Sequence, residues 1–271
     1  MELIRGKSGP QVWLDATRYL RGNPSHQDFD LILHIADPVG LSVADRAVMN
    51  RTDAFLKGHG AGSLNTVAET IFPLQDYLRG KREGVFEIYP ERMKRIHAVR
   101  SDKRWGCYAM RILRQKDRDG KVYNPLKELL EKLERMPQFK ASFELGLGHP
   151  QDEEPAGDDI AIYEGATDRK RPYGGPCLSH LSVKVDDGKI RLNATYRSHY
   201  YMQRTLGNIM GLGRLLYFLS HETGMGIGPL TINSTYARLD TGFAPANWKL
   251  ADVDALLAAC TAEYEKEKIA A

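Results

Sequence analysis

The residues best suited to chemistry in this sequence are a cysteine and an arginine in its second half. Cys177 follows a Gly-Gly-Pro turn at the start of a predicted strand, and Arg197 ends the predicted hairpin twenty residues later. Because one strand of a hairpin starts beside the end of the other, we expect Arg197 to lie near Cys177. A guanidinium there would lower the thiol pKa and favour the nucleophilic thiolate. Taken alone, Cys177 fits a small buried core residue better than a nucleophile, and its predicted neighbour Arg197 changes this balance.

Ser198 and Asn208 extend this candidate site. Arg197 and Ser198 together offer a forked donor and a hydroxyl, which suits a phosphate group. Asn208 precedes an apolar helical pattern, and its amide can donate and accept in one plane, as the edge of a pyrimidine base requires. These residues predict a nucleotide pocket with a covalent nucleophile.

The elements that must position these residues follow from local patterns. Alternating apolar residues on both sides of an Asp-Asp-Gly-Lys turn at 186–189 predict a β-hairpin. Asn208 is expected to cap a helix that ends near Gly224. Further strands are predicted at 28–36 and 230–235.

The other predicted elements are helices in one domain that covers residues 1–271. The polar segment 149–175 is expected to be a long surface loop within that domain. Ser42 and Asp45 have the spacing of a capping box. The helices are expected at 12–20, 42–57, 64–72, 125–136 and 250–269.

Composition limits the possible classes of protein. The 271 residues include 38 Lys and Arg against 35 Asp and Glu, so the net charge of +3 gives no sign of a nucleic-acid partner. The three cysteines are too far apart for a disulfide scaffold or a zinc knuckle, and no histidine pair has metal-binding spacing, so no metal is expected. The sequence lacks a signal-peptide pattern and a long apolar run, so we expect a cytoplasmic protein without a membrane partner.

The order and spacing of Pro176-Cys177, Arg197-Ser198 and Asn208 resemble the core of the thymidylate synthase family, which includes the pyrimidine-nucleotide hydroxymethylases. The resemblance covers about residues 176–239. It implies an α/β (α+β) fold with a mixed sheet flanked by helices. It also implies a homodimer that pairs sheet to sheet.

The resemblance also implies roles for the site residues. Cys177 would attack C6 of a pyrimidine nucleoside monophosphate such as dUMP or UMP. C5 would then accept a methyl or hydroxymethyl unit from 5,10-methylenetetrahydrofolate. Arg197 and Ser198 would bind the 5′-phosphate, and Asn208 would read the O4/N3 edge of the base.

Two upstream segments also resemble the family. Glu69 would be the helix-borne glutamate that organises water and moves protons, although a solvated helix glutamate is an equal interpretation. Trp105, with Gly106 and Arg111, resembles an aromatic segment of the catalytic site.

Several positions differ from the family pattern. The family's Arg-Ser-x-Asp is Arg197-Ser198-His199-Tyr200 here, so Tyr200 stands where an aspartate would anchor the folate ring. Arg238 and Asp240 replace a His-x-Tyr pair at the sugar 3′-hydroxyl, so ribose is as acceptable as deoxyribose. A pair of arginines that reaches the partner subunit's phosphate site is missing at 138–140. Arg169 or Arg171 could substitute for it, or could simply be solvated loop charges.

Three functions therefore remain open. The first is one-carbon transfer to C5 of a pyrimidine nucleotide. The second is a non-catalytic nucleotide-binding or regulatory module that has lost folate binding. The third keeps attack at C6 but uses another carbon donor or a flavin, on which Tyr200 and Trp105 could stack.

Overall fold

A seven-stranded mixed sheet forms the centre of the computed structural model, which describes residues 1–99, 107–117, 119–147 and 176–270. The strand order is β1-β2-β9-β7-β6-β5, and the short β8 pairs with β9. The strands of this sheet are β1 (Glu2–Gly6), β2 (Gln27–Ile35), β5 (Glu144–Gly146), β6 (Leu178–Asp186), β7 (Lys189–Tyr196), β8 (His199–Tyr200) and β9 (Gly226–Arg238). A two-stranded sheet pairs β3 (Gln115–Lys116) with β4 (Val122–Tyr123). The expected α/β class with a mixed sheet and flanking helices is confirmed.

Helices account for most of the remaining described chain. The α-helices are α1 (Gly9–Gly22), α2 (Val43–Gly58), α3 (Leu64–Glu69), α4 (Leu74–Glu83), α5 (Tyr89–Val99), α6 (Tyr108–Leu113), α7 (Pro125–Arg135), α9 (Leu206–Thr223) and α10 (Leu250–Ala270). Two π-helical turns, η1 (Gly84–Ile88) and η3 (Tyr201–Thr205), and a 3₁₀ turn, η2 (Lys140–Ser142), complete the described elements.

The helices that local signals predict are present with small changes in their ends. The capping box is confirmed, because Ser42 accepts from the backbone of Asp45 and the Asp45 carboxylate accepts from the backbone of Ser42. Asn124 caps α7 with Pro125 as its first residue, and Gly224 ends α9 in the left-handed region at φ 71°. α3 ends at Glu69, three residues before the predicted end.

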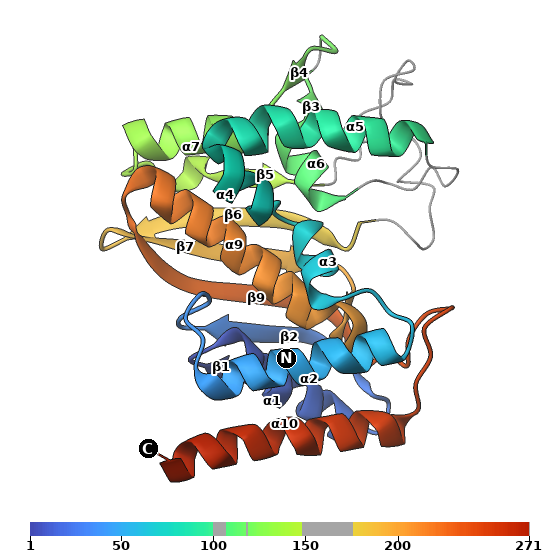
Figure 1. Cartoon of the computed structure of the whole chain (residues 1–271). Coiled ribbons are helices and arrows are strands. Elements are labelled where there is room, and N and C mark those ends of the chain that lie inside the picture. The colour runs from blue at the N-terminus through green and yellow to red at the C-terminus, as the bar shows by residue number, and fades with distance from the viewer. Residues whose placement is uncertain (100–106, 118, 148–175, 271) are drawn as a thin grey trace.

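The hydrophobic core lies between one face of the sheet and the helices packed on it. Alternate residues such as Leu33, Leu192, Ala194 and Ile232 are buried on this face, where α1 and α9 contact the strands. Figure 1 shows α9 crossing the strands β6, β7 and β9, with α10 forming an outer layer beside α2. Side chains on the opposite face of the sheet stay half-buried or exposed.

The β6–β7 hairpin sets the position of the candidate site. Its turn has Asp187 and Gly188 at φ 48° and 68°, the paired left-handed conformation of a tight type I′ connection. From this turn the strands pair back to Leu178 opposite Tyr196, with one register shift near Leu178. The hairpin predicted from the sequence is therefore confirmed, and its open end carries Cys177 and Arg197.

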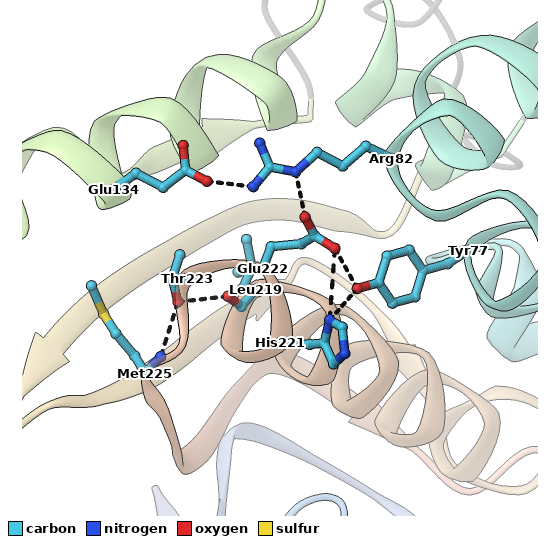
Figure 2. Close-up of polar contacts among 8 residues, drawn as sticks. All are labelled: Tyr77, Arg82, Glu134, Leu219, His221, Glu222, Thr223 and Met225. Atoms are coloured by element: carbon cyan, nitrogen blue, oxygen red, sulfur yellow. Dashed lines mark hydrogen bonds and ion pairs between the residues drawn. The ribbon is translucent and has the colours of Figure 1, made fainter.

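Three helices are tied together at the far end of α9 by a polar cluster (Figure 2). The Tyr77 hydroxyl donates to Glu222 and lies 2.7 Å from Nδ1 of His221. Arg82 of α4 donates to both Glu222 of α9 and Glu134 of α7. Burial raises the pKa of Tyr77 further above its usual value, so the phenol stays protonated as a donor. The cluster fixes the end of α9 against α4 and α7.

Replacing Tyr77 with phenylalanine is expected to lower the free energy of unfolding by about 1–2 kcal/mol, because the buried ring stays while the Glu222 and His221 contacts are lost. Chemical denaturation measures this change. Tyr217→Phe is the matched control, since its hydroxyl makes no hydrogen bond among the described residues. Equal stability of the Tyr77→Phe variant and the wild type would contradict a stabilising role for the cluster.

Candidate functional site

The open end of the hairpin brings Cys177 and Arg197 together. The Arg197 backbone N–H donates to the Cys177 carbonyl at 2.9 Å. The Arg197 Nε also donates to the carbonyl of Pro176 at 2.9 Å, which holds the exposed guanidinium beside the cysteine backbone. The proximity expected from the hairpin pattern is confirmed.

The electrostatic balance at the thiol differs from the expectation. Burial raises the pKa of the half-buried Cys177 above its usual value, and the positive charges of Arg197 and Arg204 only partly offset this rise. The expected net lowering of the thiol pKa by Arg197 is therefore wrong for this structure. The loss of solvent around the sulfur destabilises the thiolate more than the nearby positive charges stabilise it.

Tyr108, at the start of α6, is a site residue that sequence reasoning missed. Its phenolic oxygen accepts from the backbone N–H of Cys177 at 3.0 Å and of Leu178 at 3.3 Å. Burial raises the pKa of Tyr108 to about 12, so the hydroxyl is neutral at pH 7. Tyr108 therefore fixes the backbone of the cysteine. Its place in the aromatic segment already noted around Trp105 was the available signal.

Glu69 ends α3 close to this region. The next residue, Thr70, accepts from the backbone N–H of Ala109, which directly follows Tyr108. The Glu69 carboxylate is half-buried and pairs with Arg214 of α9 at 2.9 Å. Burial raises its pKa, and the Arg214 charge acts in the opposite direction. Glu69 is therefore an ion-paired residue at the junction of α3, α6 and α9, and not a solvated helix glutamate.

Asn208 does not cap α9, so that prediction is wrong. The π-helical turn η3 runs directly into α9, and Thr205 before the helix already has helical angles (φ −60°, ψ −45°). Asn208 consequently lies inside the first turn of α9 and is only 4% exposed. Its Nδ2 lies 3.1 Å from Nε2 of His199.

His199 orients the Asn208 amide. Burial lowers the pKa of His199 to about 3, so its ring is neutral at pH 7 and has one donor and one acceptor. Since Nδ2 of Asn208 can only donate, Nε2 accepts, and Nδ1 donates to the Ser234 hydroxyl at 2.9 Å. The ring also stacks on Tyr196, with centroids 4.0 Å apart and an interplanar angle of 2°. His199 thus fixes the amide of Asn208, the residue predicted to read the base.

Ser198 and Arg238 lie near the same end of the sheet. Ser198 is half-buried in the turn between β7 and β8, next to Arg197. Arg238 is exposed at the end of β9, where it pairs with Tyr200 of β8. Both residues are at least partly open to solvent, and their roles at the phosphate and the sugar stay predictions.

Asp240 is placed differently from its expected role at the sugar. It is 4% exposed, and its Oδ1 accepts from the backbone N–H groups of Met202 at 2.9 Å and Gln203 at 3.4 Å. The carboxylate therefore caps the π-helical turn η3, a contact that does not fit direct substrate binding. Burial raises the pKa of Asp240 to about 6, with the backbone hydrogen bonds acting in the opposite direction.

Asp240 is expected to make stability depend on pH. Its folded pKa of about 6 lies above the usual value of 3.8, so the stabilisation from its proton is complete below pH 4 and is lost as pH rises to 6. We expect the stability of Asp240→Asn relative to the wild type to increase by about 2 kcal/mol between pH 4 and 6, because the titration is still incomplete at both ends of this range. Denaturation at a series of pH values measures this difference. A difference that does not change with pH would contradict the assignment.

Some predicted residues fall outside the described chain. Trp105, Arg169, Arg171 and the whole of the expected loop 149–175 belong to segments that the structure does not describe. In the described ranges, no group of three or more His, Cys, Asp or Glu side chains could hold a metal ion. No helix within those ranges is long and apolar enough to cross a membrane.

An apolar cavity of about 400 Å³ lies away from Cys177, on the side of α9 that faces α1, α2 and α4. Its lining includes Leu206, Met210 and Tyr217, with Arg214 at its wall. Arg214 is bonded to Glu69 and Asn65, so this cavity borders the Glu69 junction and not the thiol.

Comparison with known proteins does not place the chain in a family. No protein-family model matches the sequence, and no curated protein matches it.

Proposed function

We propose that this protein is an enzyme of the thymidylate synthase type that acts on C5 of a pyrimidine nucleoside monophosphate. The observation that carries the proposal is the pairing of Cys177 with Arg197 at the hairpin end. Beside it, His199 of β8 orients the amide of Asn208 on α9. A thiol beside a guanidinium supplies a nucleophile and a phosphate ligand, and an oriented amide supplies base recognition.

The proposed chemical step does not need a one-carbon donor. The Cys177 thiolate adds to C6 of the ring, and the C5=C6 electron pair moves into the C5–C4–O4 enolate. C5 takes a proton from solvent and then loses its original hydrogen. The enolate re-forms the double bond and expels the thiolate, so the ring and the enzyme are restored. Exchange of the hydrogen at C5 is the product that can be measured.

Tyr200, at the position expected to anchor a folate ring, offers no carboxylate, and neither does its neighbour His199. His199 is buried and bonded to Ser234 and Asn208, and the Tyr200 ring packs edge-on against Phe243 with centroids 4.6 Å apart. These residues do not fit a folate ring held by an acid side chain. The proposed step therefore does not involve 5,10-methylenetetrahydrofolate, and the methyl or hydroxymethyl transfer is tested separately below.

Release of tritium from nucleotides labelled at C5 tests the proposed function. We expect release from at least one of UMP, dUMP, CMP and dCMP, and a loss of at least about a hundredfold in Cys177→Ser, because a hydroxyl is a far weaker nucleophile at neutral pH. Cys260→Ser, which changes a buried cysteine in α10, is the matched control. Stimulation by 5,10-methylenetetrahydrofolate would support one-carbon transfer with that donor.

The second candidate function is a nucleotide-binding module without chemistry. The observation that favours it is the raised pKa of Cys177, which leaves the thiol mostly protonated at neutral pH. Binding of a nucleotide without tritium release from any of the four labelled nucleotides would support the binding module and contradict the proposed enzymatic function. The flavin alternative gains no support from Tyr200, whose ring is already packed on Phe243.

We also propose that two copies of the chain pair through the sheet face opposite α9. On this face Asn193 lies opposite Thr231 on one side and Ser182 on the other, and all three side chains are half-buried or exposed. Pairing two such faces would remove this surface from solvent and give its polar groups hydrogen-bond partners.

Light scattering after size-exclusion chromatography tests this pairing. We expect the wild type to have the mass of a dimer and Asn193→Arg to have that of a monomer, because two facing arginines would place like charges at the centre of the interface. Asn50→Arg, at an exposed position on α2, should leave the dimer intact. A monomeric wild type would contradict the sheet-to-sheet pairing.

A further inference from the structure

The backbone of the π-helical turn η3 is held by several side-chain contacts, and the turn has a single exposed side chain. The carbonyl of Tyr201 accepts from the Trp13 indole at 2.7 Å, and Asp240 caps the following backbone N–H groups. Thr205 donates to the carbonyl of Tyr200 at 3.0 Å. Four of the five residues of the turn are buried, and Arg204 is the exposed one. A π-helical turn of this kind is frequent at functional sites.

A chain of contacts connects the hairpin end to the helix that directly follows this turn. Tyr196 pairs with Leu178, the residue after Cys177, and its ring stacks on His199. His199 in turn bonds to Asn208. Arg204 precedes Asn208 by four residues, which is about one helical turn. The positive charge of Arg204 accordingly acts on both the Cys177 thiol and the Tyr108 hydroxyl.

We propose that Arg204 is the second guanidinium of an oxyanion site at Cys177, shared with Arg197, and that this site binds the phosphate of the nucleotide. This inference rests on the proposed function and deepens it, since it makes the phosphate site complete within one chain. The sequence patterns did not indicate Arg204 as a site residue.

Charge balance favours a phosphate as the occupant. A phosphate monoester carries a charge of about −1.5 to −2 at pH 7, which one guanidinium cannot neutralise. Two exposed guanidinium groups on separate, anchored backbones can match it with several forked hydrogen bonds. The segment 138–140, where the resemblance places an arginine pair for the partner subunit, has the sequence Gln-Phe-Lys. Arg204 supplies a cation from the same chain as the thiol.

Alkylation of Cys177 tests the site without any substrate. Iodoacetate and iodoacetamide both react with the thiolate, but only iodoacetate is an anion, so the ratio of their rates reports the local positive charge. We expect Arg204→Met to lower this ratio about two- to fivefold, as loss of one nearby, partly solvated charge requires. Mass spectrometry of the modified peptide restricts the measurement to Cys177. Arg204→Lys should keep most of the ratio.

Protection by inorganic phosphate provides the second readout. Phosphate should slow the reaction of wild-type Cys177 with iodoacetamide at constant ionic strength, and Arg204→Met should need several times more phosphate for the same protection. Arg197→Met is the positive control. Arg191→Met is the matched control, because Arg191 lies on β7 six residues before Arg197, which is roughly 20 Å along an extended chain, and it pairs with Asp186 at 2.7 Å.

The outcomes separate this inference from the proposed function. An unchanged rate ratio in Arg204→Met, or equal phosphate protection in Arg204→Met and wild type, would overturn the role of Arg204 even if tritium release is observed. Absence of phosphate protection in the wild type would also overturn it. Phosphate protection that depends on Arg204, without tritium release, would support the anion site and contradict the proposed enzymatic function.

Discussion

The hydrogen-bond register of the β6–β7 hairpin is the constraint on which the candidate site depends. It fixes Tyr196 opposite Leu178 and joins the backbone of Arg197 to the Cys177 carbonyl. A slip of one residue would turn every side chain of a strand to the other face of the sheet. The paired left-handed turn at Asp187 and Gly188 and the buried residues on one face both oppose such a slip. The pairing of the two strands therefore brings Cys177 and Arg197 together.

Burial divides the site into a neutral interior and a charged rim. Burial raises the pKa of Cys177 and Tyr108 and lowers the pKa of His199, so it favours the neutral form of all three side chains. The guanidinium groups of Arg197 and Arg204 remain exposed. Neutral groups inside can be oriented by hydrogen bonds at low cost, whereas cations at the rim keep their hydration until an anion replaces it. An anionic ligand would therefore meet the cations first and would strengthen their effect by displacing water.

Support for the site comes from elements far apart in the sequence. α6 holds the backbone of Cys177 through Tyr108, and α3 holds α6 through the hydrogen bond from Ala109 to Thr70. Asp240, beyond the last strand, caps the turn that carries Arg204. Each contact is a hydrogen bond between groups that are largely removed from water, where an unpaired partner costs about 1–3 kcal/mol. The positions of Cys177, Arg204 and Asn208 are consequently coupled through the core.

The sequence by itself determined several of the local elements and one pairing, whereas β1, α4, α5 and α6 were not predicted. The period-two pattern with its Asp-Gly turn predicted the hairpin, and with it the contact between Cys177 and Arg197, because both depend on neighbours along the chain. The capping box at Ser42 and the proline start of α7 were predictable for the same reason. Tertiary structure decided the rest. It buried the thiol enough to raise its pKa, extended the helical backbone ahead of Asn208 through η3, and turned Asp240 toward a backbone it could cap. It also brought Tyr108 and Arg204 to the site. Solvent exclusion and long-range hydrogen bonds depend on which segments pack together, and no local spacing in the sequence records that.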